Sequence, residues 1–141
     1  MTSESNQRTG QCHCGGVRFR AKLSDGFETL RRCTCTYCRM RAAVVVSAEA
    51  GGVEVLQGAE LLTSYRFNTG VAQHFFCARC GIYTHHQRRS NANQYGVNVA
   101  CLDGLSPFDF AEVPVFDGVN HPSDTGGATR RAGTLRYVAE P

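Results

Sequence analysis

Seven of the eight cysteines in this 141-residue chain lie in three short clusters. The clusters are Cys12-His13-Cys14, Cys33-Thr34-Cys35-Thr36-Tyr37-Cys38 and Cys77-Ala78-Arg79-Cys80. Cysteines this close together let two thiolates reach one tetrahedral metal ion from a single tight turn, and zinc takes thiolate ligands readily. Three separate close clusters are hard to explain as coincidental core residues. The pattern therefore predicts a metal-binding protein, with zinc as the expected ion.

Two ligand arrangements are compatible with these spacings. Seven ligands could form one closed four-thiolate site and one three-thiolate site with an open position. Alternatively, Cys101 could complete a second closed site. A closed shell is typical of a structural zinc, and an open position is typical of a catalytic one. Because Cys101 continues the apolar face of Val97 and Val99, we favour a core position for it.

The rest of the sequence indicates which cellular compartment and which class of binding partner to expect. The N-terminal residues are polar and no run of 18 apolar residues occurs, so we expect a cytoplasmic protein without a signal peptide or membrane span. Disulfides are rare in that compartment, which favours metal ligation over the alternative of extracellular disulfides. The formal charge is only +3, with twelve acidic residues among fifteen basic ones, so nucleic acid is not the expected partner.

Short β-strands separated by turn signals are expected through the first hundred residues. Strands are predicted by period-two alternation or by β-branched runs, and no segment has the long 3.6-residue period of an amphipathic helix. The predicted strands are 17–23, 29–32, 44–46, 53–55, 63–68, 71–76, 82–86 and 95–102. Segments 63–68 and 71–76 form an expected hairpin, and Gly51-Gly52 is an expected break. A short helical turn is predicted over 39–43. The fold class is therefore mainly β, with small antiparallel sheets in a single domain.

The C-terminal part differs in composition, since all four prolines follow residue 103. We expect residues 8–104 to form the metal-binding domain and residues 105–141 to be an extension that packs on it. Residues 120–133 contain nothing that could form a core and are predicted as a surface loop. The segment 134–138 is predicted as a last edge strand.

Three motifs carry a resemblance to a known family. They are Gly10-Gln11-Cys12-His13-Cys14-Gly15-Gly16-Val17-Arg18-Phe19, Cys33-Thr34-Cys35-Thr36-Tyr37-Cys38-Arg39 and Phe76-Cys77-Ala78-Arg79-Cys80-Gly81. In this order, over about residues 8 to 104, they resemble the glutathione-dependent formaldehyde-activating enzyme (GFA) family, which includes centromere protein V-like domains. The resemblance implies a zinc-stabilised β-tent, in which small antiparallel sheets are arranged around zinc.

The resemblance also implies how the cysteines divide between two zinc ions. The structural set is Cys12, Cys14, Cys77 and Cys80. Because it joins distant segments, that metal would contribute folding free energy. The second set, at which catalysis is expected, is Cys33, Cys35 and Cys38.

The activity implied by the family name is that of a zinc-dependent carbon–sulfur lyase or synthase. It would join glutathione, or a similar thiol, to formaldehyde or another small aldehyde, or reverse that reaction. Zinc with three thiolates carries a net charge of −1, which suits holding a thiol deprotonated better than acidifying water. Glutathione also brings two carboxylates. The arginines expected to bind them are Arg39, Arg88 and Arg89.

Some features depart from the family pattern or leave alternatives open. Family members often carry His and Ser where this chain has Thr34 and Thr36. His85 and His86 are adjacent, so on a strand they face opposite sides, and one of them could reach the second zinc or shuttle a proton. We favour a structural role for both. The rival to the enzyme hypothesis is a non-enzymatic, zinc-stabilised interaction module. Exposed edge strands would permit a homodimer.

Overall fold

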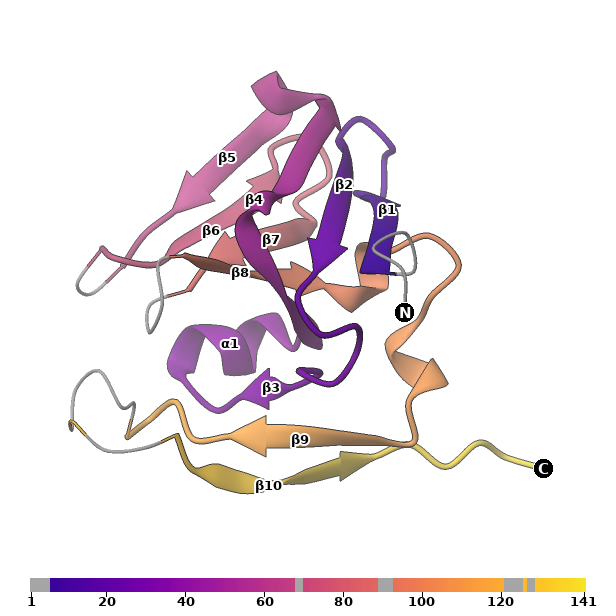
Figure 1. Ribbon diagram of the computed structural model, residues 1–141, viewed down its shortest axis with the longest axis vertical. Coiled ribbons are helices and arrows are strands. Elements are labelled where there is room, and N and C mark those ends of the chain that lie inside the picture. The colour runs from indigo at the N-terminus through magenta and orange to yellow at the C-terminus, as the bar shows by residue number, and fades with distance from the viewer. Residues whose placement is uncertain (1–5, 68–69, 89–92, 121–125, 127–128) are drawn as a thin grey trace.

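A seven-stranded antiparallel sheet forms the larger part of the fold (Figure 1). The computed structural model describes residues 6–67, 70–88, 93–120, 126 and 129–141. In spatial order the strands are β1 Gln7–Gln11, β2 Arg18–Leu23, β4 Val45–Gln57, β8 Gln94–Asn98, β7 Tyr83–Gln87, β6 Gln73–Cys77 and β5 Leu62–Tyr65. The mainly β fold class is thus confirmed, and the predicted hairpin is the antiparallel β5–β6 pair.

Alternation along the strands produces the core. In β2 the side chains of Phe19, Ala21 and Leu23 are buried while those between them are not fully buried. They pack in one cluster that includes Val46 of β4 and Val97 of β8. Apolar burial of this kind contributes roughly 25 cal/mol per Å² of apolar surface, so the period-two pattern directly selects the inward face.

The strand β4 runs through the glycine pair at which a break was expected. It is 13 residues long and bends there, because Ala21 pairs with Val53 whereas Leu23 pairs with Ala48. A Cβ on Gly52 would lie 3.0 Å from the carbonyl oxygen of Lys22, tighter than most Cβ contacts, so the neighbouring backbone would have to shift. The glycines therefore permit a bulge that curves the sheet, and they do not end the strand.

The strand β8 is shorter than predicted. It ends at Asn98, whose side-chain oxygen accepts a hydrogen bond from the Ala100 N–H at 3.1 Å and starts the 3₁₀ turn η3 Val99–Cys101. Two other 3₁₀ turns are η2 Ala59–Leu61, which precedes η3 in the chain, and η4 Pro107–Asp109, which follows it. Cys101 is buried in the core, as expected.

The helix α1 Thr36–Arg41 begins earlier than the helical turn predicted over 39–43. The Cys35 sulfur accepts a hydrogen bond from the Cys38 N–H at 3.3 Å and caps the helix, a role that cysteine rarely signals in a sequence. The helix ends at Ala42, which adopts a left-handed conformation with φ of 59°. In the part of the chain that the structure describes, no helix has the length and apolar character needed to cross a membrane.

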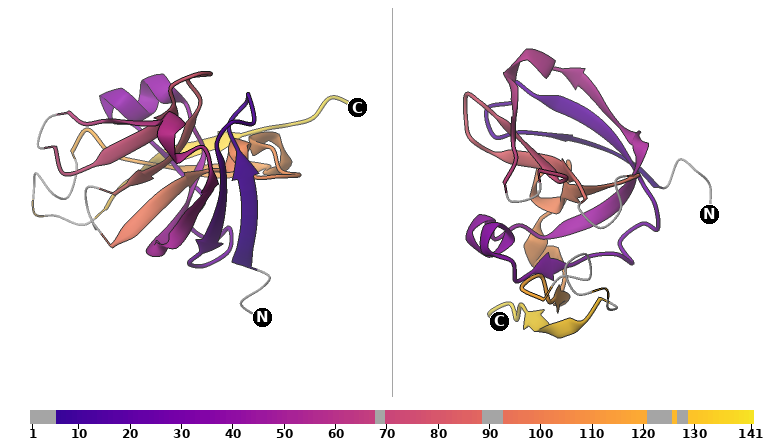
Figure 2. Two further views of the ribbon diagram at one scale, coloured as in Figure 1. Left: turned by 90° about the horizontal axis from the view of Figure 1, so that it is seen from above. Right: turned by 90° about the vertical axis from the view of Figure 1, so that its left-hand side faces the viewer.

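The C-terminal extension forms a second sheet with the middle cysteine cluster. Its strand order is β10 Arg131–Arg136, β9 Glu112–Phe116 and β3 Arg32–Cys33. The pair β3–β9 is parallel, whereas the other strand pairs of the described residues are antiparallel, as expected. Strand β10 begins inside the predicted 120–133 loop, of which 121–125 and 127–128 lie outside the described residues. In the right-hand view of Figure 2, α1 lies between the large sheet and the strands β9 and β10 of the small sheet.

Candidate metal centres

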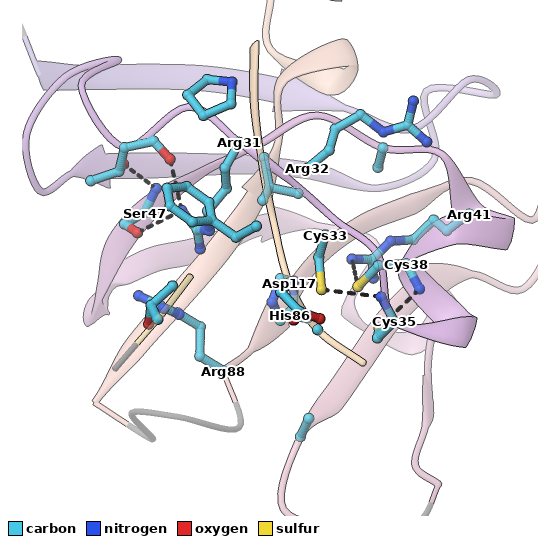
Figure 3. A pocket seen from close by; sticks show the side chains of 18 of the residues that line it. Arg31, Arg32, Cys33, Cys35, Cys38, Arg41, Ser47, His86, Arg88 and Asp117 are labelled. Carbon is cyan, nitrogen blue, oxygen red and sulfur yellow. Dashed lines mark hydrogen bonds between the residues drawn. The ribbon is translucent and has the colours of Figure 1, made fainter. Parts of the chain in front are cut away.

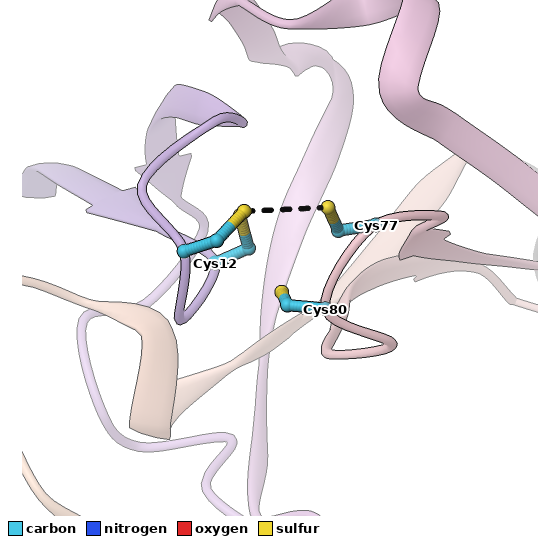
Figure 4. A group of neighbouring side chains, drawn as sticks. Cys12, Cys77 and Cys80 are labelled. Atoms are coloured by element: carbon cyan, nitrogen blue, oxygen red, sulfur yellow. Dashed lines mark hydrogen bonds between the residues drawn. The ribbon is translucent and has the colours of Figure 1, made fainter.

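Four cysteine sulfurs meet where two turns face each other across the curved large sheet (Figure 4). Cys12 and Cys14 follow β1, whereas Cys77 ends β6 and Cys80 lies in the turn after it. All four sulfurs lie within 4.8 Å of one another. We call Cys12, Cys14, Cys77 and Cys80 the four-cysteine group. It connects the first and the sixth strand of the sheet, so it spans the fold.

Backbone N–H groups surround these sulfurs. The Cys12 sulfur accepts from the Val17 N–H at 3.3 Å and the Cys14 sulfur accepts from the Gly16 N–H at 3.4 Å. Donation from Gly16 and from Arg79 lowers the pKa of Cys14 to about 6, while burial raises the pKa of Cys12 to about 11. Convergent thiols with backbone donors suit a tetrahedral thiolate-bound metal.

Three further sulfurs, those of Cys33, Cys35 and Cys38, form a second group within 4.8 Å of one another (Figure 3). We call it the three-cysteine group. Strand β3 supplies Cys33, and the start of α1 supplies Cys35 and Cys38. The Cys35 N–H donates to the Cys33 sulfur at 3.4 Å. A strand that leads directly into a capped helix thus turns one short segment into three convergent ligands.

The three thiols share their protons unequally. Donation from Cys33 and Cys38 lowers the pKa of Cys35 far below the usual value of a thiol. Contact with Cys35 raises the pKa of Cys33, and contact with Cys33 and Cys35 raises that of Cys38. One thiolate held by two thiols is the arrangement from which a metal ion displaces the remaining protons.

The three-cysteine group lies in the wall of a cavity of about 630 Å³, a size typical of small-molecule sites. The wall comes from both sheets and from α1. Gly118, beyond β9, closes on the sulfurs: its N–H donates to Thr34 Oγ1 at 3.0 Å, and a Cβ there would lie 2.2 Å from the Cys33 sulfur. The C-terminal extension therefore does more than cover the domain, because it encloses the group.

Arg41 links the three-cysteine group to the large sheet, which the sequence analysis did not predict. Its guanidinium donates to the Cys38 sulfur at 3.4 Å and to His74 Nδ1 at 2.9 Å. It also lies 3.8 Å from the centre of the Tyr83 ring and 5.0 Å from that of Tyr37, in cation–π contact. Arg41 thus places a positive charge beside a candidate thiolate ligand.

The histidines occupy both sides of the sheet. Thr84 is an extra residue in β7 opposite β6, and the resulting bulge allows the Tyr83 hydroxyl to contact His86 Nδ1 at 2.6 Å. His86 and His74 stack and line the cavity, whereas His85 packs between Phe75 and Tyr95.

The cavity histidines are uncharged at neutral pH. Burial and the nearby Arg41 charge lower the pKa of His74 to about 4, and burial lowers that of His86 well below its ordinary value. His74 Nε2 is buried without a hydrogen-bond partner among the described residues. Since Arg41 can only donate, His74 Nδ1 is the acceptor and Nε2 carries the proton.

The arginines predicted to bind carboxylates have different positions. Arg88 lines the cavity, Arg39 is exposed on α1 outside the lining, and Arg89 lies outside the described residues. Arg31 lines the cavity and was not predicted. Its position two residues before Cys33 was the available signal, because residues i and i+2 of an extended strand share a side.

Comparison with known proteins places the chain in a family. A family model described as glutathione-dependent formaldehyde-activating enzyme (GFA) matches residues 7–113. The chain belongs to this family. A Halomonas elongata protein named provisionally as a glutathione-dependent formaldehyde-activating enzyme is 36% identical over 80 residues, which is 50% of each chain. A Rhodobacter sphaeroides protein of known crystal structure is 52% identical with a TM-score of 0.75, over 76% of this chain and 98% of that one.

The match to the GFA family covers both cysteine groups and ends at residue 113, inside β9. The chain matches only half the length of the curated relative. Part of the cavity wall lies beyond the family match, namely Pro114, Phe116, Asp117, Gly118, Val119 and Thr129. The cysteine groups therefore lie within the family match, whereas one wall of the cavity comes from residues beyond it.

Proposed function

We propose that this chain is a zinc-dependent enzyme of the carbon–sulfur lyase or synthase type. It joins a small thiol such as glutathione to a small aldehyde such as formaldehyde, or cleaves the adduct. The observation that carries the proposal is the position of the three-cysteine group in the wall of a large cavity. Family membership supports the same chemistry.

The donor sets fit zinc, because thiolates are soft ligands and the sulfurs of each group already converge. Cys12, Cys14, Cys77 and Cys80 would hold a structural ion, and Cys33, Cys35 and Cys38 would hold the second. Zinc bound by three protein thiolates supplies an open position where a substrate thiol is held deprotonated. A reducing cytoplasm, which we propose as the compartment, keeps these cysteines free of disulfides.

The reaction is an addition. The thiol sulfur forms a bond to the aldehyde carbon, the carbon–oxygen double bond becomes a single bond, and the thiol proton ends on the oxygen. The cavity residues suit this change in charge, since the Arg41 guanidinium lies between the Cys38 sulfur and the neutral His74 and can only donate hydrogen bonds. A donor of this kind stabilises negative charge developing on the aldehyde oxygen. Arg88, with Arg39 and Arg89, is proposed to meet the carboxylates of the thiol.

The decisive experiment combines metal analysis with kinetics on the zinc-loaded chain. X-ray absorption at the zinc edge, recorded with and without glutathione, should show one additional sulfur ligand when glutathione is present. Nuclear magnetic resonance with ¹³C-formaldehyde should show faster adduct formation than in buffer, and Cys38→Ser should abolish the acceleration. Unchanged coordination together with an uncatalysed rate would instead support the non-enzymatic, zinc-stabilised module.

A further inference from the structure

Two arginines line the part of the cavity away from the sulfurs. In Figure 3, Arg31 and Arg88 lie on one side of the pocket, with Cys33 and Cys38 on the other. Both side chains are half-buried, and a guanidinium keeps its positive charge at neutral pH. Bringing two like charges together in a partly dry site is unfavourable unless an anion joins them.

Only neutral groups hold these arginines in the part of the chain that is described. Arg31 donates to the Thr29 carbonyl at 2.9 Å and to Ser47 Oγ at 3.0 Å, while Arg88 donates to Gln94 Oε1 at 2.5 Å. These contacts fix the direction of both side chains, and no carboxylate among the described residues forms an ion pair with either of them. They resemble a prepared binding site, because neutral acceptors orient a guanidinium while leaving donors available.

The acidic residues of the cavity lining do not supply the missing anion. Asp117 accepts hydrogen bonds from the backbone of Val119 and Asn120 at 3.0 Å each, so its carboxylate serves its own turn. The other carboxylate of the lining belongs to Glu28, which is exposed. Within the described residues neither carboxylate forms an ion pair with Arg31 or Arg88.

Spacing connects the arginine pair to the sulfurs. Arg31 and Cys33 are two residues apart on an extended chain, so their Cα atoms are separated by about 7 Å. Both residues line the same cavity, so a ligand can place a carboxylate at Arg31 and a thiol at the three-cysteine group. One molecule can engage both ends of the cavity.

We propose that Arg31 and Arg88 form an anion subsite that binds a carboxylate of the thiol substrate. The cavity then selects a thiol by the presence of a carboxylate and by the distance from that carboxylate to the sulfur. The peptide framework between the two groups is not itself recognised. This inference rests on the thiol chemistry proposed above. Paired guanidiniums suit it because each can present two parallel N–H donors to one carboxylate.

The test measures binding to the full zinc-loaded chain by calorimetry, with three probes. Glutathione should bind roughly ten- to hundredfold more tightly than glutathione diethyl ester, which keeps the thiol and loses the carboxylate charges. The variants Arg88→Gln and Arg31→Gln should weaken glutathione binding and leave ester binding unchanged. Arg20→Gln is the matched control, since Arg20 pairs with Glu54 on the exposed side of β2 and does not line the cavity.

The third probe, S-methylglutathione, separates this inference from the proposed function. S-methylglutathione has no free thiol, so it tests the carboxylate contact alone. If Arg88→Gln weakens its binding while glutathione adds no sulfur to the zinc, the subsite exists and the proposed reaction is wrong. If glutathione and its diester bind equally and Arg88→Gln changes neither, the anion subsite is wrong and the thiol chemistry stands. Because Arg31 is half-buried, circular dichroism should accompany Arg31→Gln, and Arg88→Gln decides the matter alone if Arg31→Gln does not fold.

Discussion

The two sulfur groups differ in how much of the chain lies between their members. In the four-cysteine group, Cys14 and Cys77 are 63 residues apart in sequence, and their sulfur atoms are 3.8 Å apart. In the three-cysteine group, six consecutive residues supply every ligand. A metal shared by distant segments restrains the chain, whereas one held by a single segment restrains little beyond that segment. The first arrangement suits folding and the second leaves the ion available for chemistry.

The largest effect is expected from Cys77→Ser. Cys77 is fully buried, and removing it from the four-cysteine group should prevent cooperative folding. Structural zinc sites contribute on the order of 10 kcal/mol, comparable with the whole net stability of a small domain. Thermal unfolding followed by circular dichroism in zinc-containing buffer measures this effect. Cys101→Ala, a buried cysteine in the core, is the control that should fold, and a cooperative transition of Cys77→Ser at the wild-type temperature would contradict the comparison.

Cys38→Ser should leave the fold intact and remove one metal ion. The zinc content should fall from two ions per chain to one, and adduct formation should be lost, because two thiolates bind zinc too weakly to retain it. Mass spectrometry of the metal content checks the first result. Global unfolding as severe as that of Cys77→Ser would show that both groups hold the fold and would remove the distinction between them.

Acidification should destabilise the sheet independently of either sulfur group. Burial lowers the pKa of His85 from 6.5 to about 4, so between these pH values the unfolded chain binds a proton that the folded chain excludes. Stability therefore falls as the pH decreases through this interval, by about 2 kcal/mol from pH 7 to pH 5. His85→Phe keeps a ring between Phe75 and Tyr95. Urea unfolding of this variant should lack the roughly 2 kcal/mol decrease in the free energy of unfolding between pH 7 and pH 5. An identical pH slope in the variant would assign the acid response to the other groups, namely His74, His86 and the thiolates.

The smallest effect concerns the arginine beside each group. Arg41→Gln should weaken zinc binding at the three-cysteine group by about tenfold and leave the four-cysteine group unaffected, because Arg41 contacts Cys38 alone among the described cysteines. Competition with a chromophoric chelator measures both affinities. Arg79→Gln, beside Cys14, is the counterpart for the four-cysteine group, and the exposed Arg66→Gln is the control. Equal weakening of both groups by Arg41→Gln would show that its role is general stability.

Local patterns predicted the parts of the molecule that local physics determines. The period-two alternation was sufficient to predict β2, and the expected turn at Gly70 was sufficient to predict the β5–β6 hairpin. Both signals depend on only a few consecutive residues. The spacing of the clusters indicated metal ligands, and the family resemblance divided them into the two groups that the structure brings together. The roles of those residues in catalysis remain predictions.

What the sequence could not predict depends on tertiary contacts. The parallel β3–β9 pair contains only a two-residue strand, which leaves no period to detect. The contact of Arg41 with His74 requires α1 to pack beside β6, and the Thr84 bulge that orients Tyr83 has no local signature. Arg31 could be assigned to the cavity only once the fold had brought its segment into the wall.

Cys35 joins secondary structure to ligand chemistry in a single residue. Its sulfur caps α1 by accepting from the Cys38 N–H, and its carbonyl accepts the Arg39 N–H at 2.8 Å. A helix of six residues is too short to persist by itself, so its order depends on this cap. Amide hydrogen exchange in α1 should therefore report whether the Cys35 sulfur is also shared with a metal ion. The first turn of the helix becomes a built-in gauge of whether the site is loaded, readable without any added probe.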